Sequence, residues 1–149
     1  MKRDEAVQVA EVEKNRALEV AHQQREQAAR VADRVRSGFL AKGGLVSTEC
    51  PVATGEQWDY PNGWPPLHWM AVQGLLRYGH RSLAEEVARR FCGTVKRVYE
   101  ATGRFMEKYD VVDTSREAGG GEYPNQDGFG WTNGVYLALR TSVLRGTNE

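Results

Sequence analysis

The sequence predicts an all-α protein, and three observations carry that prediction. Residues 1–36 contain 15 charged residues, eight basic and seven acidic, without any Gly or Pro. Two stretches with the apolar spacing of helices follow at 65–79 and 82–103, separated by a short link. All 16 Gly, all five Pro and all four Trp lie after position 37, so we expect the functional loops in this second part, residues 37–149.

The first helix is expected to cover residues 1–36, because Ala, Glu, Arg and Gln dominate its composition. Its apolar stripe is thin and is made of Val7, Ala10, Val20, Ala21, Ala28, Val31 and Val35. Large residues do not hold heptad positions over three or four repeats, which favours a solvated helix resting one face on the domain over a coiled-coil arm. Gly43 and Gly44 are expected to end this helix, and 44–55 to be a loop with one short extended piece.

The next two helices are expected to form an antiparallel hairpin. Pro65 suits the first turn of one helix, and Gly79 suits a left-handed cap at its end. Ser82 and Glu85 have the spacing of a capping box at the start of the other, which Gly103 ends. The short link between the helices makes them neighbours that run in opposite directions.

The C-terminal third is expected to contain more loop than helix. Residues 105–112 are interpreted as loop or short strand, and the glycines at 119–121 as a flexible turn. Thr132 or Asn133 is a candidate N-cap for a last helix that runs to about Arg145.

Composition excludes several functional classes. The 20 Lys and Arg balance the 20 Asp and Glu, so no net field attracts nucleic acid. Cys50 and Cys92 lack metal-ligand spacing, and Cys92 is expected to be a buried thiol without chemistry. No signal peptide and no run of 18 apolar residues is present, so we expect no membrane partner and a cytoplasmic location for the chain as it stands. The compartment of a longer parent protein stays open, with the periplasm as one alternative.

The segment 57–66 has the composition of a sugar site. It places Gln57, Trp58, Asp59, Asn62 and Trp64 within ten residues, directly before a helix. An indole ring packs on the apolar face of a pyranose, while carboxylate and amide groups bind its hydroxyls. The alternative is a loop whose Trp side chains only anchor it to the core, and composition alone does not favour the sugar site over it.

Two carboxylates flank the glycine-rich turn in the last third of the chain. Glu107 precedes it in Glu107-Lys108-Tyr109-Asp110, and Glu122 follows it in the segment 119–134. Glycosidases place loop carboxylates of this kind around the bond that they cleave. The alternative is an ordinary polar loop, in which Lys108 and Glu107 form only a surface charge pair.

These segments, in this order, resemble the α,α-trehalases, a family of glycoside hydrolases. Residues 57–66 fit that family's Q-W-D-x-P-x-G-W-x-P signature at every position, and Glu107-Lys108-Tyr109-Asp110 together with 120–135 resembles its last signature stretch. The resemblance runs from about Gln27 to about Leu139, so it covers the C-terminal portion of such an enzyme and leaves out residues 1–26.

The resemblance implies a fold, a reaction and a set of site residues. The hairpin would be part of an (α/α)6 barrel, and the substrate would be trehalose or a similar glucoside, hydrolysed with inversion and without metal or cofactor. Glu107 would be the catalytic base. Glu122, Trp58, Asp59 and Gln57 would bind the sugar.

The sequence departs from the family pattern upstream of Gln27. The aspartate that serves as catalytic acid and the N-terminal signature of the family have no counterpart here, which suggests a truncated or rearranged gene product. A partial barrel leaves helix faces exposed, at about 25 cal/mol for each Å² of apolar surface. We therefore expect marginal stability, self-association or docking to an upstream trehalase half, which sedimentation tests.

Three other hypotheses stay open at this point. The chain could be a non-catalytic carbohydrate-binding module that uses its Trp residues. It could be an interaction protein in which the helix over residues 1–36 mediates assembly and the sugar motifs are relics. A related (α/α)6-barrel hydrolase acting on another glucoside is the closest rival within the enzyme class.

Overall fold

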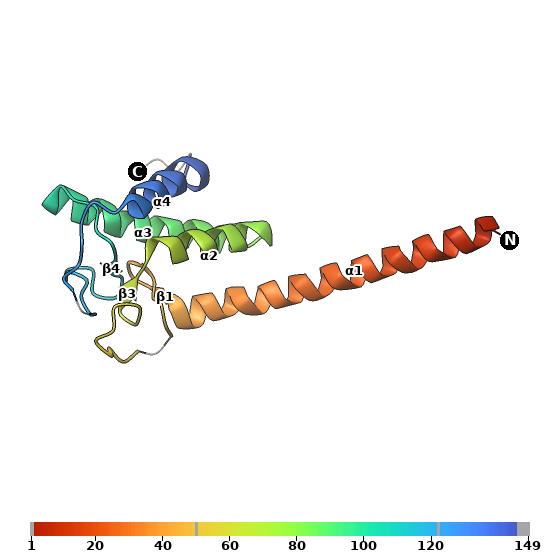
Figure 1. The fold of residues 1–149 in the computed structure, drawn as a ribbon, viewed down its shortest axis with the longest axis horizontal. Coiled ribbons are helices and arrows are strands. Elements are labelled where there is room, and N and C mark those ends of the chain that lie inside the picture. The colour runs from red at the N-terminus through yellow and green to blue at the C-terminus, as the bar shows by residue number, and fades with distance from the viewer. Residues whose placement is uncertain (1, 50, 122, 146–149) are drawn as a thin grey trace.

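A computed structural model describes residues 2–49, 51–121 and 123–145 of the chain, with side chains from residue 6 onward. Helices dominate these ranges, as predicted (Figure 1). The helices are α1 (Lys2–Arg34), α2 (Pro65–Arg77), α3 (Arg81–Thr102) and α4 (Gly130–Ala138), and π-helical turns at Val35–Phe39 and Leu139–Val143 extend α1 and α4. Four strands of two residues each complete the described part: β1 (Leu40–Ala41), β2 (Gly44–Leu45), β3 (Asn62–Gly63) and β4 (Tyr109–Asp110).

Helix α1 is an arm that leaves the rest of the molecule (Figure 1). Its 33 residues extend about 50 Å at about 1.5 Å per residue. Residues 6–20 are all exposed, and along the described side chains the first buried one is Ala32. Only the C-terminal end of α1 therefore packs on the domain, whereas one whole face of the helix was expected to do so.

The predicted end of the first helix at Gly43 and Gly44 is wrong. The helical turns end at Phe39, and the two glycines lie at the turn of a hairpin in which β1 pairs antiparallel with β2. A Cβ atom on Gly43 would lie 2.6 Å from Thr94 Oγ1, and one on Gly44 would collide with Nε2 of His68. Both positions require glycine because the hairpin packs closely on the helices beneath it.

Helices α2 and α3 form the predicted antiparallel hairpin, and the core lies between α3 and its neighbours. The largest fully buried apolar side chains of these elements are Val72, Leu83, Val87, Phe91 and Val95. Gly79 has the expected left-handed backbone, with φ of 84°, and Gly103 ends α3 as expected, with φ of 70°.

Two predicted helix caps are wrong. Helix α3 begins at Arg81, so Ser82 lies inside its first turn and no side chain caps it. Helix α4 begins at Gly130, and Thr132 does not cap it: the buried hydroxyl donates to the main-chain oxygen of Met106 at 2.6 Å. In both cases the helix starts earlier than the polar residue that was expected to begin it.

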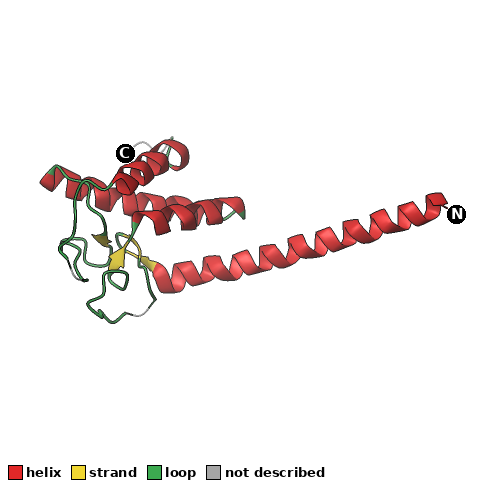
Figure 2. Ribbon diagram, viewed as in Figure 1, coloured by secondary structure: helices red, strands yellow, loops and turns green. Residues whose placement is uncertain are grey.

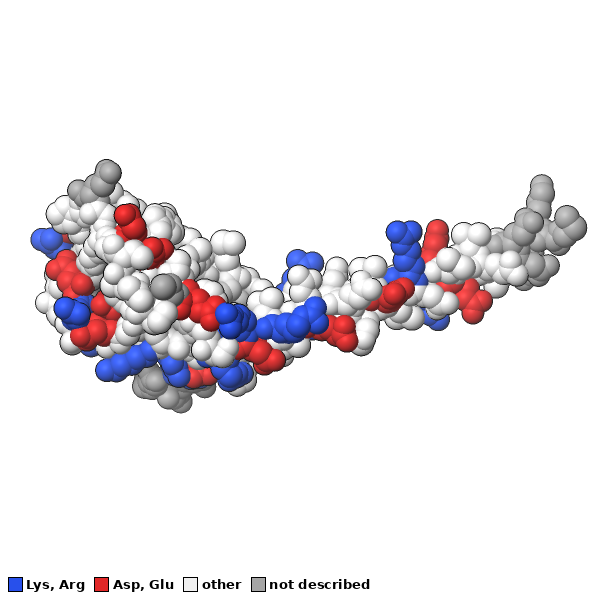
Figure 3. All heavy atoms as spheres, turned by 90° about the horizontal axis from the view of Figure 1, so that it is seen from below, with Lys and Arg blue, Asp and Glu red and all other residues white. Residues whose placement is uncertain are grey.

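The short strands and most loops gather on one side of the helices, beside the C-terminal end of α1 (Figure 2). Strand β4 was expected as loop or short strand, whereas β3 was not predicted. Positive and negative side chains alternate over the face of the molecule drawn in Figure 3, which agrees with the balanced composition. No helix in the described ranges is long and apolar enough to cross a membrane.

Candidate functional site

The strands β3 and β4 bring the two halves of the candidate site together. They pair antiparallel, with Asn62 opposite Asp110 and Gly63 opposite Tyr109. The main-chain N–H of Val111 also donates to the oxygen of Pro61 at 3.2 Å. The tryptophan-rich segment 57–66 therefore lies beside the segment that carries Glu107.

The glycine-rich segment 119–134 forms hydrogen bonds with the Glu107 segment and with the loop before Gln57. The N–H of Glu107 donates to the main-chain oxygen of Gln126 at 2.7 Å, and the N–H of Gly121 donates to that of Gly55 at 2.9 Å. Gly121 has a φ of 79°, and a Cβ atom there would lie 3.0 Å from the side chain of Gln57. Glycine is needed at this position because both the backbone conformation and the close approach exclude a side chain.

Glu107 lies at the centre of these contacts and is only 3% exposed. Its Oε2 accepts a hydrogen bond from the ammonium of Lys108 at 2.9 Å, and its Oε1 accepts one from the hydroxyl of Tyr123 at 3.2 Å. Its main-chain oxygen accepts from Nε1 of Trp131, also at 3.2 Å. Lys108 and Tyr123 therefore hold the carboxylate in one orientation, while Trp131 holds the backbone of Glu107.

Lys108 is fully buried, which contradicts the interpretation of Glu107 and Lys108 as a surface charge pair. Its Nζ lies 5.3 Å from the ring centre of Trp64 and 5.4 Å from that of Tyr123. Aromatic faces attract a cation by their quadrupole, so the two rings and the carboxylate together compensate for the lost hydration of the ammonium.

Three tryptophans form a cluster next to this ion pair. The rings of Trp58 and Trp64 are stacked, with centroids 3.7 Å apart and planes 4° from parallel, and Trp131 meets Trp64 edge-on at 5.6 Å. Trp64 is buried, whereas Trp58 is 47% exposed. Trp58 therefore presents one aromatic face to solvent on a rigid support, which is the geometry that a pyranose ring requires.

Gln57 and Asp59 take different places in this loop. The main-chain oxygen of Gln57 accepts from Trp64 Nε1 at 2.9 Å and from Asn62 Nδ2 at 3.1 Å. Its side-chain Oε1 is buried and has no hydrogen-bond partner among the described residues. The partly buried Asp59 accepts from the hydroxyl of Thr54 at 2.7 Å. Gln57 thus supports the loop through its backbone.

Glu122, the second predicted carboxylate, lies outside the described residues, so its position relative to Glu107 stays a prediction. Sequence reasoning missed the contacts of Lys108, Tyr123 and Trp131 with Glu107. The aromatic and apolar neighbours Met106 and Tyr109 were the signal that the Glu107–Lys108 segment is buried, and both are buried in the structure.

The buried His68 of helix α2 connects two of the loop segments by hydrogen bonds. Nε2 of His68 accepts from the N–H of Leu45 at 2.7 Å, and Nδ1 lies 2.8 Å from the main-chain oxygen of Trp64, to which it donates when the ring is neutral. Burial lowers the pKa of His68 from 6.5 to about 4, although the bond to Trp64 acts in the opposite direction. The neutral ring therefore connects the β1–β2 hairpin to the segment that holds Trp64.

The remaining titratable groups near the core have structural roles. Burial raises the pKa of the Cys92 thiol to about 12, as expected for an inert cysteine, whereas Cys50 lies outside the described residues. Burial also raises the pKa of Tyr109 to about 12, and its hydroxyl oxygen accepts from the N–H of Met106 at 2.9 Å. Within the described ranges, no group of three His, Cys, Asp or Glu is arranged to hold a metal ion.

Comparison with known proteins gives the same family from sequence and from structure. The family model described as Trehalase matches residues 15–143. The periplasmic trehalase of Pseudomonas aeruginosa is 54% identical over 114 residues, which are 76% of this chain and 21% of that protein. The solved structure of neutral trehalase Nth1 from Saccharomyces cerevisiae matches with a TM-score of 0.61 and 27% identity, over 78% of this chain and 20% of the yeast one. The chain thus spans about a fifth of the length of either relative.

Proposed function

Because the chain belongs to the trehalase family, we propose that it forms the part of a trehalase that carries the catalytic base. The proposed reaction is the hydrolysis of α,α-trehalose to two glucose molecules with inversion at one anomeric carbon. The observation that carries the proposal is the buried Glu107 carboxylate, held by Lys108 and Tyr123 beneath the stacked rings of Trp64 and Trp58.

Glu107 is proposed to take a proton from the attacking water. Its Oε2 is bound to the Lys108 ammonium at 2.9 Å, while the contact of Oε1 with the Tyr123 hydroxyl is longer, at 3.2 Å. Oε1 is therefore the oxygen that a water molecule reaches more readily. Lys108 keeps the carboxylate in place while that water attacks.

The sugar is proposed to lie on the exposed face of Trp58. Asp59 and Gln57 lie in the same loop and are proposed as further sugar contacts, on the resemblance. Glu122 follows the glycine turn and is proposed as a further substrate contact, on the resemblance alone. No metal or organic cofactor is required for this chemistry.

The catalytic acid is proposed to come from the part of a trehalase that this chain does not contain. Inverting glycosidases place their two carboxyl groups about 6.5–9.5 Å apart, which leaves room for the water. The relatives are about five times longer than the matched segment, so an upstream half of the fold, completing an (α/α)6 barrel, is the proposed source of the acid.

Glucose release from trehalose tests the proposal, with the chain assayed alone and beside Glu107→Gln prepared in the same way. Glutamine keeps the shape of the side chain and its contact with Lys108 but cannot accept the proton. Loss of a general base typically costs a factor of 10² to 10⁴, so we expect any measured activity to fall by that amount. Glucose release by the chain that Glu107→Gln retains in full would refute Glu107 as the base, whereas no release by either protein would mean that the chain needs the part that supplies the acid.

Carbohydrate binding without catalysis is the second candidate function, and the 47% exposed ring of Trp58 favours it specifically. Trehalose binding that is measured by calorimetry and lost in Trp58→Ala, with no glucose release from either protein, would select this function. Tyr78→Ala is the matched control, because Tyr78 is 40% exposed on the turn after α2 and makes no contact in the tryptophan stack.

A further inference from the structure

The segment 125–132 runs beside the part of the chain that carries Glu107. The N–H of Glu107 donates to the main-chain oxygen of Gln126 at 2.7 Å, and the N–H of Gly128 donates to that of Phe105 at 2.9 Å. These two bonds flank an antiparallel β-bridge between the two parts of the chain. The segment therefore fixes the backbone up to and including Glu107.

Side chains of the same segment bind three consecutive main-chain oxygens around Glu107. The donor and acceptor residues are Thr132 with Met106 at 2.6 Å, Trp131 with Glu107 at 3.2 Å, and Asn125 with Lys108 at 3.2 Å. All three acceptor residues are buried, so these donors take the place of water at their main-chain oxygens. The backbone is thus held from the residue before Glu107 to the residue after it.

Thr132 is the member of this set that acts through the backbone alone. It is fully buried, and its hydroxyl makes the shortest of the three bonds. Trp131, by contrast, also packs edge-on against Trp64, and Lys108 binds the Glu107 carboxylate itself. Removal of the Thr132 hydroxyl therefore reaches Glu107 through the position of the main chain.

We propose that Thr132, together with Asn125, is a positioning residue for the candidate catalytic base. The inference rests on the proposed function, since it takes Glu107 as that base. A side chain moves with its own backbone, and a displacement of about 1 Å near the chemistry can cost about 10²-fold in rate. The hydrogen bonds of Thr132 and Asn125 keep the Glu107 carboxylate where Lys108 and Tyr123 reach it.

A purely structural role for Thr132 is the alternative, and Thr94 is the matched comparison. The Thr94 side chain is 2% exposed, and its hydroxyl donates to the main-chain oxygen of Gly43 at 3.0 Å. Its other hydrogen bond, to the oxygen of Arg90, also ends outside residues 105–108. Loss of either hydroxyl should destabilise the chain, whereas only the loss at Thr132 should displace Glu107.

Nuclear magnetic resonance of the 149-residue chain tests the proposal. The readouts are the carbon-13 signal of the Glu107 carboxyl, which Glu107→Gln identifies by its loss, and hydrogen exchange of the Glu107 amide relative to the amides of α3. Thr132→Val keeps the volume and removes the donor, whereas Thr132→Ser keeps the donor and removes a methyl group. Asn125→Ala removes a second donor at a partly buried position, which provides a milder variant.

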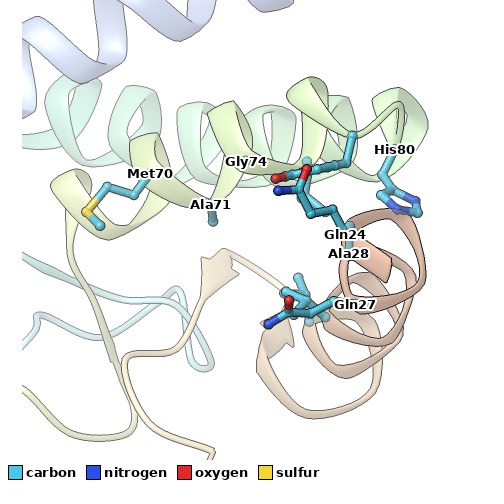
Figure 4. A pocket seen from close by; sticks show the side chains of 11 residues that line it. Gln24, Gln27, Ala28, Met70, Ala71, Gly74 and His80 are labelled. Atoms are coloured by element: carbon cyan, nitrogen blue, oxygen red, sulfur yellow. The ribbon is translucent and has the colours of Figure 1, made fainter. Parts of the chain in front are cut away.

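We expect Thr132→Val and Asn125→Ala to shift the carboxyl signal and to speed exchange of the Glu107 amide about tenfold, the effect of one lost hydrogen bond on local opening. Thr132→Ser should behave as the wild type, because its hydroxyl remains. Thr94→Val should lower stability without either change. Gln27→Ala is the surface control, because Gln27 is exposed in the groove between α1 and α2 and should also change neither readout (Figure 4).

Three results would overturn the proposal: an unmoved carboxyl signal in the folded Thr132→Val and Asn125→Ala variants, an equal shift in Thr94→Val, or a shift that Thr132→Ser shares. Where the wild-type chain releases glucose, Thr132→Val should lower kcat about tenfold or more and leave KM nearly unchanged. Glucose release that Glu107→Gln retains would remove the proposed function instead, because the magnetic resonance readouts report the position of Glu107 whether or not it is the base.

Discussion

Lys108 is the side chain on which the candidate site depends most directly at the scale of single residues. It is fully buried, and it bridges the Glu107 carboxylate and the faces of Trp64 and Tyr123. A buried ion pair adds little to stability in comparison with apolar residues, but removing one partner leaves an uncompensated charge. Lys108 therefore serves to orient Glu107 rather than to strengthen the fold.

Lys108→Met is expected to lower the free energy of unfolding by about 3–5 kcal/mol, because the Glu107 carboxylate loses its counter-ion in the interior. Urea unfolding measures the change. The double variant with Glu107→Gln should lose less, since no buried charge remains. Lys96→Met is the control: Lys96 and Glu100 are 3.8 Å apart and more than half exposed, so the change should stay within about 0.5 kcal/mol. A single variant as stable as the wild type would refute Lys108 as the counter-ion that the buried Glu107 carboxylate needs.

The two stacked tryptophans should respond differently to truncation. Trp64 is 1% exposed, so Trp64→Ala is expected to cost about 3–5 kcal/mol of unfolding free energy through the cavity that it leaves. Trp58→Ala removes a half-exposed ring and should cost clearly less while abolishing trehalose binding. Thermal unfolding with calorimetry of trehalose binding separates the two effects. Similar stability losses in both variants would contradict the description of Trp58 as a half-exposed ring that rests on the buried Trp64.

At the scale of elements, the sequence allowed the helices to be predicted and the small strands only in part. Helices α2 and α3 follow from apolar spacing and glycine ends, because those signals are local. The pairing of β3 with β4 joins Asn62 to Asp110 across the whole helical hairpin, and two-residue strands have no periodicity to detect. The caps predicted at Ser82 and Thr132 are wrong, and for Thr132 the reason is a tertiary contact with Met106 that the local sequence does not reveal.

The β1–β2 hairpin should detach from α2 in mild acid, because His68 holds it in the neutral form. The pKa of His68 is 6.5 when unfolded and about 4 when folded, so the unfolded chain binds more protons between these values. Stability is then fully present above pH 6.5 and is lost as the pH falls towards 4. We expect about 2 kcal/mol of loss between pH 6.5 and pH 5.

Unfolding in urea at several pH values measures this dependence. His68→Gln keeps an acceptor for the N–H of Leu45 but cannot titrate, so its stability should vary less over this range. His22→Gln is the control, because His22 is 72% exposed on α1 and should leave the pH dependence as it is in the wild type. The same pH dependence in His68→Gln would contradict the assignment.

At the scale of the whole molecule, the arm of α1 is nearly independent of the domain. Residues 6–20 are all exposed, and the core begins at Ala32. Removing residues 1–20 is therefore expected to change the unfolding free energy by no more than about 0.5 kcal/mol, as for surface changes in general. Calorimetric unfolding measures it, with Ala32→Arg as a destabilising comparison. A loss above about 2 kcal/mol would mean that the arm packs on the domain.

The pairing of β3 with β4 also has a consequence for how the site assembles. The two strands are the ends of a loop that contains α2 and α3, and closing 47 residues of flexible chain costs about 3 kcal/mol of entropy. An antiparallel helical hairpin brings its own ends together, so most of that entropy is lost before the strands meet. The turn at Gly79 lies at the other end of the hairpin from Trp64. By forming the hairpin, this distant turn helps to bring Trp64 and Glu107 close together.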